Sequence, residues 1–131
     1  MLDKKNIAIL VGTTALIIGF VVWGLQEEPE APTADPSAIV YYYGDGCPHC
    51  TVVEEFLKAN DIASKVSFEK KEVWSNRTNA KELEARAIAC GIDPEELGVP
   101  FVYGGDGRCY VGEPDAKKFF SEKAGIVPIE E

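Results

Sequence analysis

The sequence predicts an α/β domain of order βαβαββα, with a four-stranded mixed sheet and helices on both faces. Three observations point to this fold. A short β-branched and aromatic run, Ile39–Tyr43, is followed after a glycine-rich break by an amphipathic helical pattern, which is typical of a buried strand leading into a helix. A second alternating segment and a second helical pattern come next. Two strands around a glycine-rich turn and a last helix then end the chain, so a parallel crossover joins an antiparallel hairpin.

The remaining elements follow from local patterns. The first helix begins beside Cys47-Pro48-His49-Cys50 and turns apolar residues to one face. Polar helix caps precede the second helix, Gly91 ends it, and Pro114 opens the last one, which directs Phe119 and Phe120 inward. In order after the first helix, the predicted segments are a strand at Lys65–Val73, a helix ending near Cys90, a capped turn at 93–96, a strand at Val99–Tyr103, a turn at 104–107, a strand at Arg108–Val111 and a helix at Pro114–Gly125.

An uncharged run from Ile7 to Leu25 precedes this domain. As a helix it spans about 28 Å, close to the roughly 30 Å hydrocarbon thickness of a bilayer. Lys4 and Lys5 lie before it, and positive flanks stay in the cytoplasm. We expect a single-pass anchor in the cell (inner) membrane, with the domain on the periplasmic or equivalent outer side. A cleaved signal peptide is the alternative, although the run is long for one.

The chain is therefore predicted to have five parts: a cytoplasmic N-terminus at 1–6, a transmembrane anchor at 7–25, a flexible linker at 26–38, a folded domain at 39–126 and a tail at 127–131. The linker is rich in proline, alanine and acidic residues, a composition that stays extended. The net charge of −9 argues against nucleic-acid binding, which needs a basic surface. A monomer is expected.

Cys47-Pro48-His49-Cys50 carries the predicted chemistry. Cys47 falls at the helix cap, where backbone amides and the helix dipole stabilise a thiolate. It is expected to be the exposed nucleophile, and Cys50, one turn further, to resolve the mixed disulfide. His49, the one histidine, is expected to add positive charge near the thiolate, and Pro48 to stiffen the loop.

Three other interpretations of this motif stay open. A structural zinc site needs four ligands, and Cys90 and Cys109 are isolated in the sequence. A copper carrier is helped by methionines, and Met1 is the only one. A purely stabilising disulfide is the third possibility. We expect neither a metal nor another cofactor.

Pro100 is the second signal. It opens a strand, a position that proline tolerates, but we expect its bond to Val99 to be cis, which is uncommon in proteins. A cis bond is expected to turn the Val99 backbone toward the redox loop, with its amide and carbonyl available to a substrate strand.

Together, the first strand, Cys47-Pro48-His49-Cys50, the Val99-Pro100 step, the final hairpin and Gly112 resemble the thioredoxin-like superfamily over about Ile39 to Ile126. Cys-Pro-His-Cys with valine before the proline is most similar to the DsbA-type periplasmic oxidases. The resemblance implies that Cys47 attacks, Cys50 resolves and Val99-Pro100 holds the substrate, with an oxidising potential.

The chain departs from this family in three ways. It lacks the large helical insertion of DsbA-like proteins, so the domain is closer to a glutaredoxin in size. Tyr41 takes the place of a buried acid six residues before Cys47, and Gly46 that of a tryptophan. We expect no dimerisation domain, which argues against a DsbC-like isomerase.

The sequence thus predicts an exported, membrane-tethered thiol–disulfide oxidoreductase whose partners are cysteine-containing proteins and a redox protein of unknown identity. The alternatives are an anchored reductant of the cytochrome c maturation type and a copper or zinc metallochaperone. In a thioredoxin-like topology Cys90 and Cys109 both lie at the end away from Cys47. They are expected to form a structural disulfide, with two buried free thiols as the alternative.

Overall fold

A computed structural model describes residues 3–6 and 35–126 of the chain. The chain divides into two compact units, residues 1–32 and 33–131. The predicted anchor at 7–25, most of the predicted linker and the tail at 127–131 lie outside the described residues. Within the described ranges, no helix combines the length and the apolar character needed to cross a bilayer.

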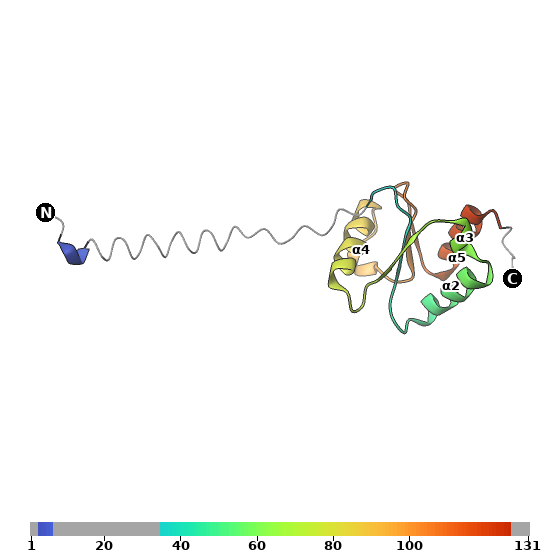
Figure 1. The fold of residues 1–131 in the computed structure, drawn as a ribbon, viewed down its shortest axis with the longest axis horizontal. Helices are drawn as coiled ribbons and strands as arrows, with labels where there is room; N and C mark the ends of the chain where they lie inside the picture. The colour runs from blue at the N-terminus through green and yellow to red at the C-terminus, as the bar shows by residue number, and fades with distance from the viewer. Residues whose placement is uncertain (1–2, 7–34, 127–131) are drawn as a thin grey trace. The chain divides into compact units, whose positions relative to one another are not determined.

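The second unit has the predicted order of strands and helices (Figure 1). One short helix, α3, was not predicted, and the expected capped turn at 93–96 is the 3-10 helix η1. The elements are β1 (Val40–Tyr43), α2 (Pro48–Ala59), α3 (Ile62–Lys65), β2 (Glu69–Glu72), α4 (Arg77–Ala89), η1 (Pro94–Glu96), β3 (Phe101–Tyr103), β4 (Cys109–Val111) and α5 (Glu113–Ala124).

The four strands form one mixed sheet in the order β2-β1-β3-β4. β1 pairs in parallel with β2, and β3 pairs antiparallel with both β1 and β4. The parallel pair needs a crossover, which α2 and α3 supply, whereas a tight turn suffices for the β3–β4 hairpin. This confirms the predicted mixed sheet.

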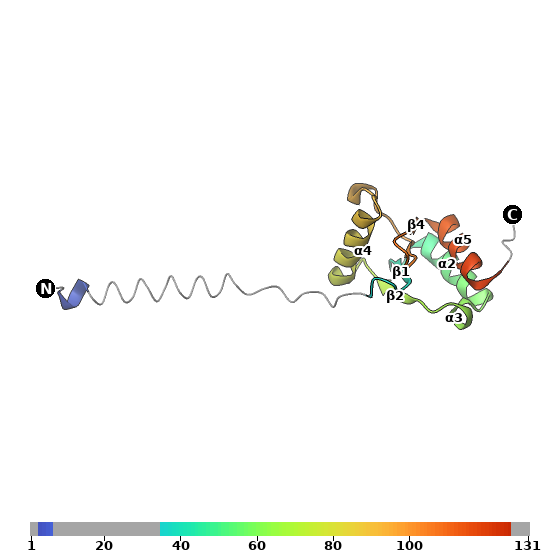
Figure 2. The same cartoon turned by 90° about the horizontal axis from the view of Figure 1, so that it is seen from above.

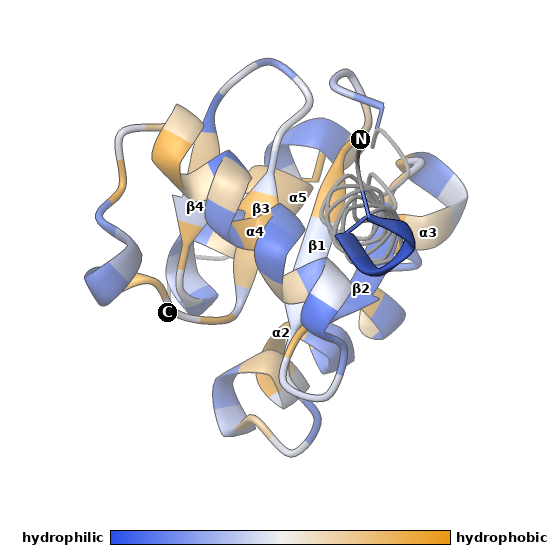
Figure 3. Ribbon diagram, turned by 90° about the vertical axis from the view of Figure 1, so that its left-hand side faces the viewer, coloured by the Kyte–Doolittle hydropathy of each residue, from blue (hydrophilic) through white to orange (hydrophobic). Residues whose placement is uncertain are grey.

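Helices cover both faces of the sheet, α4 on one and α2, α3 and α5 on the other (Figures 1 and 2). The helices carry hydrophilic and hydrophobic residues in alternating bands (Figure 3), as expected for helices that bury one side. Along β1, Tyr41 faces one layer, and Val40 and Tyr42 face the other, because side chains alternate along a strand. The first core holds Tyr41, Val53, Leu57, Ile62, Val66, Val102, Ala116, Phe119 and Phe120. The second holds Val40, Tyr42, Val73, Leu83, Ala87, Phe101 and Tyr103.

The second strand is shorter than predicted. Lys65–Val73 was expected to be extended throughout, but α3 ends at Lys65 and β2 covers only Glu69–Glu72. β2 is an edge strand whose one partner is β1, and the register from Val40↔Glu69 to Tyr43↔Glu72 uses all four residues of β1. The length of β1 therefore limits the length of β2.

Asp35 and Pro36, which the sequence assigns to the linker, contact the folded domain. The Tyr103 hydroxyl donates to the Pro36 carbonyl at 2.9 Å, and Arg86 Nη2 donates to the Asp35 carbonyl at 3.2 Å. These contacts lie at the start of β1, because Tyr103 pairs with Val40. The loop that carries the cysteine pair leaves the other end of β1, so chain entry and cysteine pair lie at opposite ends of this strand.

Candidate functional site

The cysteine pair lies where β1 passes into α2. Cys47 is the N-cap of α2 and has extended backbone angles, and Pro48 occupies the first turn of the helix. Proline fits there because the first helical amides have no partner within the helix. The Cys47 amide donates to the Gly44 carbonyl at 3.1 Å. Gly46 has a φ of 79°, which glycine adopts without strain. The loop is thus a tight turn that ends with Cys47 at the helix cap, as predicted.

The sulfur of Cys47 accepts a hydrogen bond from the Cys50 amide at 3.2 Å. This amide is one of the free donors at the N-terminus of α2, where the helix dipole also favours negative charge. The backbone of α2 thus supplies a hydrogen-bond donor to the Cys47 sulfur. Both sulfurs are free thiols in this structure.

The expectation that Cys47 is exposed is wrong, because only 4% of the residue is accessible to solvent. The Cys47 thiol lies 3.8 Å from the Val99 carbonyl oxygen, to which it donates. The segment before Pro100 thus covers the sulfur, an arrangement that joins residues far apart in the sequence.

Cys50 is in a different environment. It is 2% exposed, and burial, followed by the hydrogen bond with Cys47, raises the pKa of its thiol to about 12. The negative charge of Glu54 also raises this pKa, and the Gly44 backbone lowers it. At neutral pH Cys50 is therefore a protonated thiol. The surroundings of the two sulfurs therefore differ: burial keeps Cys50 a neutral thiol, whereas the Cys47 sulfur accepts from a backbone amide and lies beside the Val99 carbonyl.

The bond between Val99 and Pro100 is cis, as predicted. Pro100 is buried, and its carbonyl accepts from the Gly112 amide at 2.8 Å. Val99 is half-buried and faces the redox loop. Its carbonyl is engaged by the Cys47 thiol, whereas its amide has no hydrogen bond to another described residue.

His49 points away from the position expected for it. Its side chain is 73% exposed, and its Nδ1 lies 3.3 Å from Glu113 Oε2 at the start of α5. Among the described residues its hydrogen bonds do not include Cys47. Glu113 also lies 3.7 Å from Lys117. Glu113 was not among the residues predicted for the site, although its place directly after Gly112 puts it at the edge of the sheet where the redox loop lies.

Tyr41 contacts the Cys50 backbone and occupies the position where the family resemblance would put an acid. Its hydroxyl donates to the Cys50 carbonyl at 3.3 Å, and burial raises the pKa of this phenol. Glu54, one turn after Cys50, is half-buried and pairs with Lys70 at 2.7 Å. A carboxylate does raise the pKa of Cys50, but it is Glu54 of α2 rather than a residue of β1. The four-residue spacing of Cys50 and Glu54 in a predicted helix was the sequence signal that could have found it.

Glu72 connects the redox loop to the loop between β2 and α4. Its carboxylate accepts from the amides of Trp74 at 2.7 Å, Ser75 at 2.9 Å and Asn76 at 3.1 Å, and from the Asp45 amide at 3.4 Å. The hydrogen bond from the Ser75 hydroxyl, followed by those from the Ser75, Trp74 and Asp45 amides, lowers the pKa of Glu72 to about 2. The two loops are thus joined by one carboxylate.

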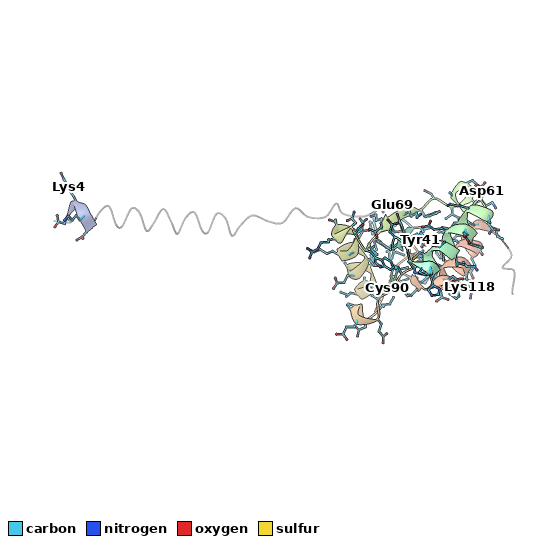
Figure 4. All side chains as sticks on the ribbon, turned by 90° about the horizontal axis from the view of Figure 1, so that it is seen from below. Lys4, Tyr41, Asp61, Glu69, Cys90 and Lys118 are labelled. Carbon is cyan, nitrogen blue, oxygen red and sulfur yellow. A yellow bond between two sulfur atoms is a disulfide. The ribbon has the colours of Figure 1, made fainter. Side chains whose placement is uncertain are left out.

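Cys90 and Cys109 form a disulfide with a Cα–Cα distance of 6.0 Å, which confirms the predicted pairing. Cys90 caps the C-terminal end of α4 (Figure 4). Cys109 pairs with Tyr103, which in turn faces Val40. This disulfide therefore lies at the end of the sheet away from Cys47, as expected.

Within residues 3–6 and 35–126, no three histidine, cysteine, aspartate or glutamate side chains are grouped closely enough to hold a metal ion. The arrangement around Cys47 supplies a sulfur at a helix N-terminus, a protonated second thiol and the Val99 backbone carbonyl. Neither a family model, nor a curated protein, nor a solved structure matches this chain.

Proposed function

We propose that this chain is a thiol–disulfide oxidoreductase that exchanges disulfides with cysteine-containing proteins through Cys47 and Cys50. The observation that carries the proposal is the unlike state of the two sulfurs. The Cys50 amide and the N-terminus of α2 stabilise a thiolate at Cys47, whereas burial keeps Cys50 a thiol. The four-stranded mixed sheet, the cysteine pair at the first helix and the cis-proline beside it are compatible with a thioredoxin-like protein.

In the dithiol form, the Cys47 thiolate attacks one sulfur of a substrate disulfide. That S–S bond breaks, a Cys47–substrate disulfide forms, and the other substrate sulfur leaves as a thiolate and takes up a proton. Cys50 then loses its proton and attacks Cys47 Sγ, which forms the Cys47–Cys50 disulfide and releases the second substrate thiol. Two electrons pass to the substrate, and the reverse sequence oxidises a substrate dithiol.

We propose the oxidising direction. A stabilised thiolate at Cys47 favours the reduced form of the pair, and a couple whose reduced form is stabilised is a stronger oxidant. A partner protein must then reoxidise the dithiol. We further propose that residues 7–25 anchor the chain in the cell membrane with the domain outside, where disulfides persist. Membrane-bound protein that resists alkaline extraction, with a protease-accessible domain, is the expected result; a shorter soluble form would indicate cleavage.

The reduction potential of the Cys47–Cys50 couple tests the direction. The full chain is equilibrated in glutathione buffers, and the trapped thiols are counted by mass spectrometry. We expect a potential nearer to the oxidant value of about −120 mV than to the reductant value of about −270 mV. A value at the reductant end would assign the chain to the anchored reductants.

Variants test the chemistry itself. Cys47→Ser is expected to abolish disulfide transfer to a reduced, unfolded protein. Cys50→Ser is expected to accumulate mixed disulfides through Cys47 when the substrate offered carries a disulfide, whose S–S bond the Cys47 thiolate breaks. The double variant Cys90→Ser/Cys109→Ser is the control and keeps both reactions. Mixed disulfides formed through Cys50 in the Cys47→Ser protein would reverse the assigned roles. Stoichiometric Cu(I) or Zn(II) binding without transfer would favour the metallochaperone.

A further inference from the structure

A groove of about 350 Å³ lies beside the cysteine pair, between the loop after β2, the helix α4 and the segment before Pro100. Its walls are mostly apolar and include Trp74, Leu83, Leu97 and Val99. Val99 belongs both to the groove and to the redox site, because its carbonyl lies 3.8 Å from Cys47 Sγ. A polypeptide joined to Cys47 would therefore pass the mouth of this groove.

Trp74 is an unusual residue to find at a protein surface. It is 60% exposed, yet it is held from two sides. Its amide donates to Glu72 at 2.7 Å, and its indole packs so closely on Gly44 that a Cβ there would overlap the ring. A large apolar ring that is fixed in place but left open to solvent is typical of a contact surface for a partner.

The lining of the groove carries one negative charge. Glu84 is the one charged residue among those that line it, and it forms no ion pair with another described residue. Glu95 and Glu96 directly follow Pro94, which also lines the groove. Two cations of α4, Arg77 and Lys81, precede Glu84 in the helix and are not lining residues. An occupant with a positive charge complements this surface.

We propose that this groove binds the substrate segment next to its reactive cysteine, and that it selects extended polypeptides carrying a large apolar side chain and a lysine or arginine within two residues of that cysteine. Successive residues of an extended chain are about 3.3 Å apart, so a neighbour of the attacked cysteine reaches past Val99 into the groove. This inference rests on the proposed function for the identity of the reacting residue, but the binding itself needs no redox step.

Noncovalent binding tests the proposal separately from the chemistry. The full chain carrying Cys47→Ser and Cys50→Ser is titrated with three extended peptides in which serine replaces the reactive cysteine. One carries phenylalanine and lysine beside the serine, the second phenylalanine and glutamate, and the third serine and lysine. We expect the first to bind at least tenfold more tightly than the other two by calorimetry.

Groove variants locate the binding. Glu84→Lys, an exposed substitution, is expected to reverse the preference between the lysine and glutamate peptides. Trp74→Ala is expected to weaken both phenylalanine peptides. Ile88→Ser is the matched control, because Ile88 is 56% exposed on the same helix and does not line the groove, and it leaves all three affinities unchanged.

Equal affinity for the three peptides, or a preference that Glu84→Lys leaves unchanged, would overturn the proposal. Self-association that Trp74→Ala abolishes would instead assign the groove to a second copy of this chain. Turnover of a small neutral disulfide, hydroxyethyl disulfide, by the unsubstituted chain with both cysteines reports on the chemistry alone. Normal turnover without peptide selectivity rejects the groove proposal only, whereas peptide selectivity without turnover in the unsubstituted chain rejects the redox function only.

Discussion

Cys50 and its neighbour Glu54 make the chemistry of the redox loop depend on pH. Burial is the main cause that raises the pKa of Cys50 to about 12, and the charge of Glu54 adds to it. The pKa of Cys50 in the folded, reduced chain lies above the ordinary cysteine value of about 8.5. The neutral Cys50 thiol therefore contributes its full stabilisation to the fold at pH values below about 8.5. This contribution is lost as the pH rises toward 12.

Alkylation of the reduced chain at a series of pH values measures this difference. We expect iodoacetamide to modify Cys47 at neutral pH, and the rate at Cys50 to keep rising well above pH 9. Glu54→Gln removes a negative charge and is expected to shift the Cys50 profile to lower pH. Glu55→Gln, the next residue in the same helix, is the control. Labelling of Cys50 before Cys47 would contradict the assignment of the nucleophile.

His49 is a residue for which sequence and structure give different surroundings. The sequence predicts that it stabilises the Cys47 thiolate, whereas the structure directs its Nδ1 to Glu113. If its charge still reaches Cys47 through solvent, His49→Ala destabilises the thiolate and makes the couple less oxidising. We expect the reduction potential to fall, with about 30 mV for each tenfold change in the equilibrium constant. An unchanged potential would remove His49 from the mechanism.

At the level of elements, the turn of the β3–β4 hairpin packs against the segment that precedes β1. Gly105 and Gly107 both have positive φ, 75° and 82°. A Cβ at Gly105 would overlap the Ser37 carbonyl, whereas a Cβ at Gly107 would meet nothing within 4 Å. Alanine substitutions at Gly105 and Gly107 therefore separate the cost of a left-handed backbone, which both share, from the cost of the close contact with Ser37, which only Gly105 makes.

We expect Gly107→Ala to lower the free energy of unfolding by about 1–2 kcal/mol, the cost of a left-handed residue with a side chain. Gly105→Ala is expected to cost more, because Ser37 must also move. Urea unfolding of the two variants measures the difference. Equal losses would mean that the contact between the hairpin and Ser37 contributes little to stability.

The elements that were predicted well have a local signal, and those that were missed do not. The β-branched and aromatic run Ile39–Tyr43 and the proline after Cys47 are visible in the sequence, and so is the glycine turn of the hairpin. The start of β2 depends instead on pairing with β1. The burial of Cys47 depends on Val99, and the groove depends on the meeting of Trp74 with α4 and the segment before Pro100. Such contacts join distant residues, and no local pattern records them.

At the level of the whole molecule, a different interaction stabilises the domain at each end of its sheet, a carboxylate network at one and a disulfide at the other. Near the cysteine pair, the carboxylate of Glu72 joins two loops. At the far end, the Cys90–Cys109 disulfide ties the end of α4 to β4, beside the residues where the chain enters. Reactivity and covalent support are thus kept at opposite ends of β1.

This separation predicts what removal of the disulfide does. Cys90 and Cys109 are 19 residues apart, and closing a loop of that size restricts the unfolded chain by about 3 kcal/mol in the chain-entropy model. A small domain with a modest core depends on such support. We therefore expect Cys90→Ser/Cys109→Ser to lower the free energy of unfolding by about 2–4 kcal/mol, measured by urea unfolding with Cys47 and Cys50 oxidised in both proteins.

Because the Cys90–Cys109 disulfide lies far from Cys47, the reduction potential of the Cys47–Cys50 couple should stay unchanged in this variant. Mild reductant should open Cys47–Cys50 first in the unsubstituted chain, as read by peptide mapping. Free alkylation of Cys90 and Cys109 in the native, air-oxidised protein would show that this support does not exist in solution.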